Sequence, residues 1–103
     1  MAQNILQELH ELVKKREANP IVGSYTNYLL SKGEDKICLK VSEQAAELVI
    51  ALKNHDHEEI IHEAADLLYH MTVALATNDV TWNEVSEEMR NRRTSDTQPC
   101  EHA

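Results

Sequence analysis

The chain has 103 residues, which fits one domain with a thin core, so pairing with a second copy would help to stabilise it. Its formal net charge of -8 disfavours unaided binding to nucleic acid or to an anionic membrane, because their phosphate groups would be repelled. No segment approaches the roughly 18 consecutive apolar residues of a membrane-spanning helix, and no basic stretch followed by an apolar run opens the chain. We therefore expect neither export nor membrane insertion.

The composition predicts an all-α protein. Hydrophobic residues make up 42% of the chain, but aromatic residues only 4%, so aliphatic side chains must fill the core. Two Gly and two Pro leave few places for tight hairpin turns, whereas Ala, Leu, Glu and Lys favour helices. The two cysteines, Cys38 and Cys100, show no framework spacing, which indicates a reducing, cytoplasmic setting.

Two helices are predicted in the first third of the chain. Residues 2–17 place apolar side chains on one stripe at helical spacing, and Asn19-Pro20 ends this pattern. Ser24 is suited to cap the start of a short second helix. Gly33 is placed to end that helix in a left-handed conformation, within a turn over residues 32–35.

Two longer amphipathic helices follow. From residue 35 to about residue 54 apolar side chains recur every three or four positions, which predicts a third helix. Asp56 followed by Glu59 predicts the N-cap of a fourth helix that ends near Asn78. The short connection between them favours antiparallel packing. Their apolar stripes are Ile37, Val41, Ala45, Leu48, Val49 and Leu52, then Ile60, Ile61, Ala64, Leu67, Leu68, Met71 and Leu75.

The last helix and the C-terminal tail complete the prediction. Thr81 and Glu84 form a capping box ahead of a helix that runs to about residue 93. Residues 94–103 lack any apolar period, and we expect them to be a disordered polar tail. The predicted architecture is one all-helical domain over residues 1–93, a bundle of about five helices that pairs as a dimer.

Charged residues share one narrow face of the third predicted helix. At about 100° per residue, Lys36, Lys40, Glu43 and Glu47 fall on this face, with Gln44 at its edge. The face is rotated away from the apolar stripe. It therefore presents two lysines and two acids to whatever lies beside the helix.

The fourth predicted helix repeats this arrangement. Glu63 and Asp66 are three residues apart and His70 follows four residues later, so about two turns present two carboxylates and an imidazole together. Antiparallel packing would bring Glu43, Glu47, Glu63 and Asp66 into one small volume. Carboxylates that converge in this way repel one another, and a hard cation such as Mg²⁺, which prefers oxygen ligands, relieves the repulsion. Such a cation would also bridge the acids to phosphate groups.

A solvated helix face is the competing interpretation. Glu and Lys at spacings of three and four residues commonly form weak ion pairs on an exposed surface. Asp66 favours the metal site, because Ala64, Ala65, Leu67 and Leu68 surround it in the most apolar part of its helix. A buried aspartate in that position requires a partner or a metal.

Four segments in this order and spacing resemble the phosphoribosyl-ATP pyrophosphohydrolase family, and the resemblance extends to about Arg93. It implies hydrolysis of phosphoribosyl-ATP to phosphoribosyl-AMP and pyrophosphate, the second step of histidine biosynthesis. It also implies an all-α fold, a Mg²⁺ cofactor and a homodimer. The segments are Ser24-Tyr25-Thr26, Lys32-Gly33-Glu34-Asp35-Lys36, Lys40-Val41-Ser42-Glu43-Gln44-Ala45-Ala46-Glu47 and Glu63-Ala64-Ala65-Asp66-Leu67-Leu68-Tyr69-His70.

The resemblance also implies roles for individual residues. Glu43 and Glu47 are the expected catalytic residues, which activate water. Metal ligation is expected from five side chains, and substrate binding from five others. The implied metal ligands are Glu43, Gln44, Glu47, Glu63 and Asp66, and the implied substrate-binding residues are Lys32, Lys36, Lys40, Tyr69 and His70.

One position departs from the family pattern. The family reads Glu-Glu-x-x-Glu where this chain has Glu43-Gln44-Ala45-Ala46-Glu47, so an amide replaces the second acid. Gln44 still offers an oxygen to a metal, but without charge. Two alternatives therefore stay open: a nucleotide-cleansing pyrophosphohydrolase of the same fold that acts on other nucleoside triphosphates, and a degenerate copy whose helices serve only dimerisation.

Two further groups of side chains have ordinary interpretations. His55, His57 and His62 form the densest group of histidines, but no cysteine or further ligand recurs at the spacing of a zinc finger. We expect His55 and His57 in an exposed turn. Tyr25 and Tyr28 could stack on a nucleotide base, but tyrosines on a short amphipathic helix more often pack with the hydroxyl at the surface.

Overall fold

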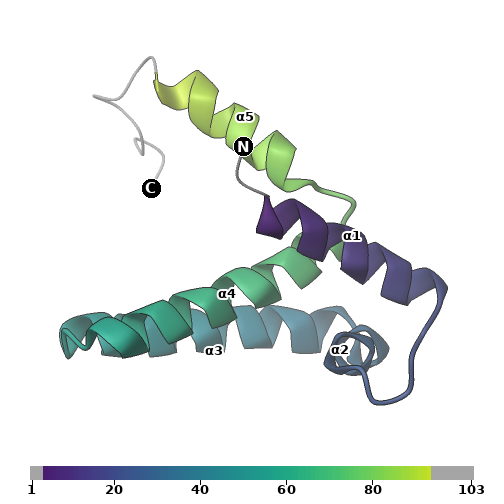
Figure 1. Cartoon of the computed structure of the whole chain (residues 1–103), viewed down its shortest axis with the longest axis horizontal. Coiled ribbons are helices and arrows are strands. Elements are labelled where there is room, and N and C mark those ends of the chain that lie inside the picture. Colours follow the sequence, from purple (N-terminus) through teal and green to yellow (C-terminus); the bar gives the residue numbers. More distant parts are fainter. Residues whose placement is uncertain (1–3, 94–103) are drawn as a thin grey trace.

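The computed structural model of the chain describes residues 4–93, which form five α-helices and no strand. The all-α prediction is confirmed. Figure 1 shows α3 and α4 side by side, α1 and α2 at one end of this pair, and α5 projecting away. The predicted tail, residues 94–103, lies outside the described residues. The helices are α1 (Ile5–Ala18), α2 (Tyr25–Lys32), α3 (Glu34–Lys53), α4 (His57–Thr77) and α5 (Trp82–Arg93).

Side-chain caps fix where α2 and α4 begin. The hydroxyl of Ser24 accepts a hydrogen bond of 3.1 Å from the backbone N–H of Asn27. The carboxylate of Asp56 accepts one of 3.2 Å from the backbone N–H of Glu59. Both caps satisfy N–H groups that have no partner inside the helix. The two predicted helix starts are confirmed.

A reciprocal capping box starts α5. The backbone N–H of Glu84 donates to Thr81 Oγ1 at 3.1 Å, and the backbone N–H of Thr81 donates to Glu84 Oε1 at 2.9 Å. This is the arrangement that the sequence predicted. It turns the chain out of α4 and into a helix whose main contact is with α1.

Gly33 joins α2 to α3 in a single residue. It ends α2 and caps α3 with φ +91 and ψ -177. The predicted left-handed φ at the end of α2 is confirmed, but ψ is extended, a combination that essentially only glycine adopts. The predicted turn over residues 32–35 is wrong, since α3 begins at Glu34. The result is a sharp change of direction: Figure 1 shows α2 nearly end-on where α3 lies across the view.

The hydrophobic core lies where α1 and α2 meet the α3–α4 pair. Its buried members come from four helices, and three half-buried residues, Leu30, Tyr69 and Ala74, pack against them. This core fixes the position of α2 relative to α4. The buried members are Val13, Leu29, Ile37, Val73 and Ala76.

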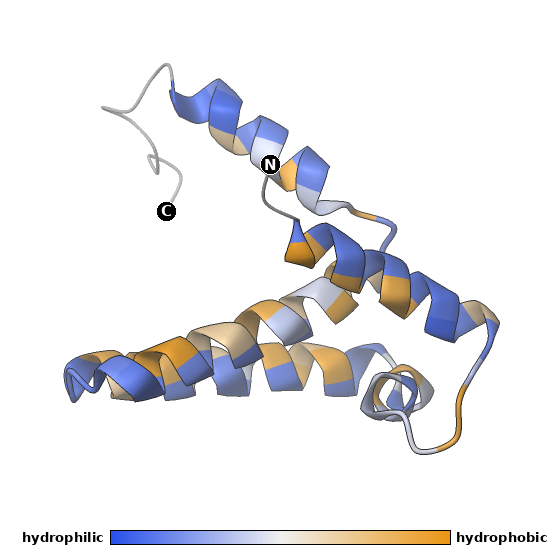
Figure 2. Cartoon of the chain, viewed as in Figure 1, coloured by the Kyte–Doolittle hydropathy of each residue, from blue (hydrophilic) through white to orange (hydrophobic). Residues whose placement is uncertain are grey.

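The far halves of α3 and α4 leave apolar side chains exposed. The sequence stripes predicted that these residues are covered, but Val49 and Ile61 are more than half exposed, at 55% and 58%. Two helices packed on each other can bury only the sides that face each other, and none of the other three described helices covers this end (Figures 1 and 2). The exposed apolar residues of this region, named here the outer apolar patch, are Val49, Ile50, Leu52, Ile61 and Leu68.

Two other expectations from the sequence concern membrane insertion and the cysteines. None of the five described helices combines the length and the apolar character that crossing a membrane requires. Cys38 is exposed and unpaired among residues 4–93, and Cys100 lies outside that range.

Replacing Thr72 with Val tests a buried hydrogen bond that ties α5 to the core. The fully buried Thr72 hydroxyl donates to the Leu68 carbonyl at 2.7 Å and accepts from Trp82 Nε1 at 2.8 Å. Valine has the same shape but leaves the indole N–H without an acceptor. The free energy of unfolding should fall by about 1–3 kcal/mol, measured by urea denaturation.

Ser31→Ala is the control for this substitution. The Ser31 hydroxyl is exposed and donates to the Tyr28 carbonyl, so its loss should change the free energy of unfolding by less than about 0.5 kcal/mol. Equal stability of Thr72→Val and the wild type would contradict the assigned role of Thr72.

Candidate metal centre

The centre of the site is a pair of carboxyl groups from two helices, Glu47 on α3 and Glu63 on α4. Burial raises the pKa of Glu63, and the negative charge of Glu47 and a hydrogen bond between the two carboxyl groups raise it further. When both groups are ionised, neither can donate to the other. Glu63 Oε1 is buried and then has no hydrogen-bond partner among the described residues. The pair therefore favours either a proton or a cation between α3 and α4.

Gln44 adds a second unsatisfied oxygen to the same helix interface. Its side chain is only 7% exposed, and Gln44 Oε1 is buried without a partner in the described part of the chain. Gln44 precedes Glu47 by three residues, so the two lie about one turn apart on α3. Between residues 4 and 93, Gln44 Oε1 and Glu63 Oε1 are the two buried side-chain atoms of this kind. A buried oxygen without a partner costs about 1–3 kcal/mol, which a bound cation would offset.

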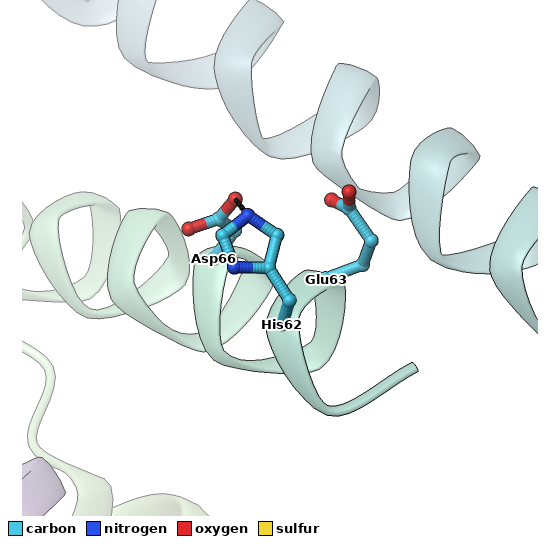
Figure 3. A group of neighbouring side chains, drawn as sticks. All are labelled: His62, Glu63 and Asp66. Atoms are coloured by element: carbon cyan, nitrogen blue, oxygen red, sulfur yellow. Dashed lines mark ion pairs between the residues drawn. The ribbon is translucent and has the colours of Figure 1, made fainter. Parts of the chain in front are cut away.

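Two further side chains of α4, those of His62 and Asp66, lie close to Glu63. His62, Glu63 and Asp66 each place one ligand atom within 4.8 Å of the others, and Figure 3 shows them projecting from one side of the helix. His62 Nε2 lies 3.4 Å from Asp66 Oδ2. Asp66 is half-buried, so the expectation of a buried aspartate is wrong: its face of α4 is covered only partly by α3. The sequence analysis did not assign His62 to this site, although its spacing of four residues from Asp66 was the available signal.

Glu43 occupies the rim of the site. It is exposed, and its carboxylate forms an ion pair with Lys40 Nζ at 3.6 Å. Lys36 lies one turn before Lys40 and forms no ion pair with another described residue. Lys32, at the end of α2, places its Nζ 5.6 Å from the ring centre of Tyr28. These three lysines, named here the lysine row, recur every four residues in the sequence ahead of Glu43 and Glu47.

His70 lies inside the helix packing. Its Nδ1 is 2.8 Å from the backbone carbonyl of Asp66, and its Nε2 is 3.1 Å from the hydroxyl of Tyr25. Because a carbonyl only accepts, Nδ1 carries the proton, and the neutral ring then accepts at Nε2 from the Tyr25 hydroxyl. Both ring nitrogens are therefore engaged within the chain, which leaves neither to a ligand in this state.

Tyr69 forms a parallel link between α4 and α2. Its hydroxyl lies 2.6 Å from Thr26 Oγ1, and burial raises the pKa of the phenol. The links Tyr69–Thr26 and His70–Tyr25 join successive residues of α4 to successive residues of α2. They fix the orientation of α2 about one turn of α4 beyond Asp66.

A pocket of about 630 Å³ lies at the opposite end of the α3–α4 pair. Arg16, Asn27, Leu30, Ile37 and Thr77 are among its lining residues. None of the residues that the sequence assigned to the site lines it. Ile37 and Glu47 are ten residues apart on α3, or about 15 Å along the helix, so the pocket is separate from the acidic residues.

Comparison with known proteins supports the resemblance. A family model described as phosphoribosyl-ATP pyrophosphohydrolase matches residues 6–93. The phosphoribosyl-ATP pyrophosphatase of Bacillus cytotoxicus is 44% identical over 90 residues, which cover 87% of this chain and 84% of that protein. The enzyme of the same name from Lactiplantibacillus plantarum is 45% identical over 87 residues, covering 84% of this chain and 82% of that protein.

Longer relatives match with similar identity. The histidine biosynthesis bifunctional protein HisIE of Caldanaerobacter subterraneus subsp. tengcongensis is 49% identical over 88 residues, which cover 85% of this chain. The protein of the same name from Prochlorococcus marinus is 46% identical over 96 residues. The chain spans 43% and 42% of the length of these two relatives, so it corresponds to one part of each.

Glu63→Gln should stabilise the metal-free protein at neutral pH. Because the pKa of Glu63 is raised in the folded protein, its contribution to stability is fully present below the ordinary value of 4.5 and is lost as the pH rises through the folded-state pKa. The Glu63→Gln variant carries no carboxylate at this position, so it does not lose stability in this way. In EDTA it should melt above the wild type at neutral pH and together with it below the ordinary pKa, as measured by circular dichroism.

A second measurement compares the wild type and Glu63→Gln after addition of Mg²⁺. The ion should raise the melting temperature of the wild type more than that of Glu63→Gln, because it binds the folded wild type more tightly. A variant that melts below the metal-free wild type at neutral pH would show that the Glu63 charge is not a source of strain.

Proposed function

Because the chain belongs to the phosphoribosyl-ATP pyrophosphohydrolase family, we propose that it hydrolyses phosphoribosyl-ATP to phosphoribosyl-AMP and pyrophosphate in histidine biosynthesis. The family match covers 6–93, nearly all described residues, and relatives that carry the name of this activity align over most of their own length. The observation that supports the proposal most strongly is the meeting of Glu47 and Glu63 between α3 and α4, with the buried, unsatisfied oxygen of Gln44 one turn before Glu47.

The acidic residues fit a hard divalent cation. The family uses a metal ion, and in this chain the oxygens of Gln44, Glu47, Glu63 and Asp66, with Glu43 at the rim, are the groups that would hold one. We propose Mg²⁺, because all of these ligands are oxygens and because the substrate carries phosphate groups. When bound, the ion would neutralise the carboxylates and polarise the phosphate linkage that is cleaved. Gln44 keeps an oxygen in place of the usual acid but contributes no charge.

The chain's own side chains supply the remaining steps. The lysine row, Lys32, Lys36 and Lys40, carries the positive charges that would bind the outer phosphate groups. A water molecule attacks the linkage between the first and second phosphates, and its proton passes to Glu47 or to Glu43. The products leave as phosphoribosyl-AMP and pyrophosphate. Glu47 is the favoured base, since it lies against Glu63 at the centre of the site.

We also propose that two copies of the chain pair through the outer apolar patch. The patch residues lie on α3 and α4 and are 37% to 60% exposed in the described chain. Large apolar side chains that a helix pair leaves exposed are typical of a protein interface. Pairing would enlarge the thin core of a 103-residue chain. The exposed, unpaired Cys38 agrees with the reducing cytoplasm as the location.

Pyrophosphate release from a panel of substrates tests the reaction. We expect Mg²⁺-dependent turnover of phosphoribosyl-ATP and little turnover of ordinary or deoxynucleoside triphosphates. Glu47→Gln and Asp66→Asn should each lower turnover by at least about a hundredfold. Glu58→Gln is the matched control: Glu58 is exposed in the first turn of the same α4 helix but lies outside the site, and its turnover should match the wild type.

The outcomes separate the three interpretations of the family resemblance. Preferred turnover of deoxynucleoside triphosphates would point to a nucleotide-cleansing enzyme. Absence of turnover with every substrate, together with absence of Mg²⁺ binding, would make the chain a non-catalytic copy. Unchanged turnover and Mg²⁺ dependence in both Glu47→Gln and Asp66→Asn would refute the assigned roles.

Ile61→Glu tests the proposed dimer. Ile61 lies in the outer apolar patch at 58% exposure, so a charge there should prevent pairing and give a monomer in sedimentation experiments. Val22→Glu, in the fully exposed loop before α2, should leave the dimer intact. A wild type that sediments as a monomer, or an Ile61→Glu variant that remains a dimer, would contradict pairing through this patch.

A further inference from the structure

Three tyrosine rings stand in a row from α4 to α2. The ring centres of Tyr69 and Tyr25 are 6.0 Å apart at an interplanar angle of 28°, and those of Tyr25 and Tyr28 are 5.8 Å apart at 22°. These are offset-stacked arrangements. The hydrogen bonds from Tyr69 to Thr26 and from Tyr25 to His70 hold the first two rings in place. The row is therefore a fixed surface.

The outer end of this row faces solvent. Tyr25 and Tyr28 are 46% and 44% exposed, although both sit on a helix that packs into the core through Leu29. Lys32 Nζ lies over the ring of Tyr28, 5.6 Å from its centre, so a base that stacks on this face displaces a mobile ammonium group. Flat aromatic surface next to a cation suits a ligand that combines a planar ring system with negative charge.

The inner end of the row adjoins the acidic site. Tyr69 follows Asp66 by three residues on α4, about 4.5 Å along the helix axis. His70, which orients Tyr25, is bonded to the backbone carbonyl of Asp66 itself. A ligand with phosphates at the carboxylates and a planar group attached to them would thus have the tyrosines within reach.

We propose that Tyr28, the outermost ring of the row, is the surface on which the purine base of the bound nucleotide stacks, and that Tyr25 supports it from behind. This inference rests on the proposed function and assigns the base-recognition part of the same site. The carboxylates and lysines bind features common to every polyphosphate. Stacking on Tyr28 supplies the preference for a nucleotide over its sugar phosphate or over inorganic pyrophosphate.

Binding of AMP and of ribose 5-phosphate in the presence of Mg²⁺ tests the proposal, because these probes differ only in the base. Titration followed by NMR should show that the wild type binds AMP at least about fivefold more tightly than ribose 5-phosphate. Tyr28→Leu should lose this preference without a change in ribose 5-phosphate affinity, whereas Tyr28→Phe should keep it. Met89→Leu, an exposed apolar position on α5, is the control and should bind both probes as the wild type does.

Each other outcome overturns the proposal in a recognisable way. Equal binding of the two probes by the wild type, or an unchanged preference in Tyr28→Leu, removes the stacking surface but leaves the proposed reaction intact if phosphoribosyl-ATP is still cleaved. Absence of AMP binding and of cleavage by the wild type removes both proposals. A Tyr28→Leu protein that changes its oligomeric state in sedimentation would place a second copy, rather than a base, on Tyr28.

Discussion

Glu47 and Glu63 face each other from neighbouring helices, and their proximity is the constraint around which the candidate site is arranged. Packing of α3 on α4 desolvates Glu63, and the nearby negative charge opposes its ionisation. Gln44 and Glu63 each retain a buried oxygen with no partner in the described chain. Helix packing that served stability alone would not collect such groups, because apolar residues of similar size would pack there without this cost. The cation proposed above would explain the arrangement, because it would neutralise the carboxylates and satisfy the two oxygens.

Elements far from the carboxylates set their geometry. Asp56 caps α4 and so fixes the register in which Glu63 and Asp66 face α3. Gly33, with a backbone conformation open essentially only to glycine, turns α2 across the end of α3. The links Tyr25–His70 and Thr26–Tyr69 then hold α2 against the turn of α4 that follows Asp66. Short local signals thereby place the tyrosines of α2 next to α4, which carries two of the acids of the candidate site.

Periodicity and capping predicted the helices well because both are local. The spacing of apolar residues defines a helix face, and Ser24, Asp56 and the Thr81–Glu84 box each act within three residues. Local patterns also predicted that Glu47 and Glu63 meet, since a short connection leaves α3 and α4 little choice but to pack antiparallel. The ψ angle of Gly33 could not be predicted. A glycine at a helix end indicates a positive φ, but the sequence does not show which ψ the two neighbouring helices impose.

Burial was harder to predict, because it depends on what covers a helix. Asp66 sits among apolar neighbours in sequence, yet those neighbours turn to other sides of α4 and leave the carboxylate half-exposed. Ile61 and Val49 belong to regular apolar stripes, but no third helix among residues 4–93 covers them. His62 was grouped with other histidines of the turn, whereas helix geometry places it beside Asp66. In each case the periodicity was right, but the sequence did not show which other element lies beside the side chain.

The most direct test of the account is a crystal structure with Mn²⁺, which takes the oxygen ligands that suit Mg²⁺ and can be located by its anomalous scattering. We expect an anomalous peak between α3 and α4, with Gln44 Oε1 and Glu63 Oε1 turned toward the Mn²⁺ ion and the carboxylate of Glu47 in contact with it. Absence of a peak at saturating Mn²⁺, with both oxygens hydrogen-bonded to ordered water instead, would contradict it.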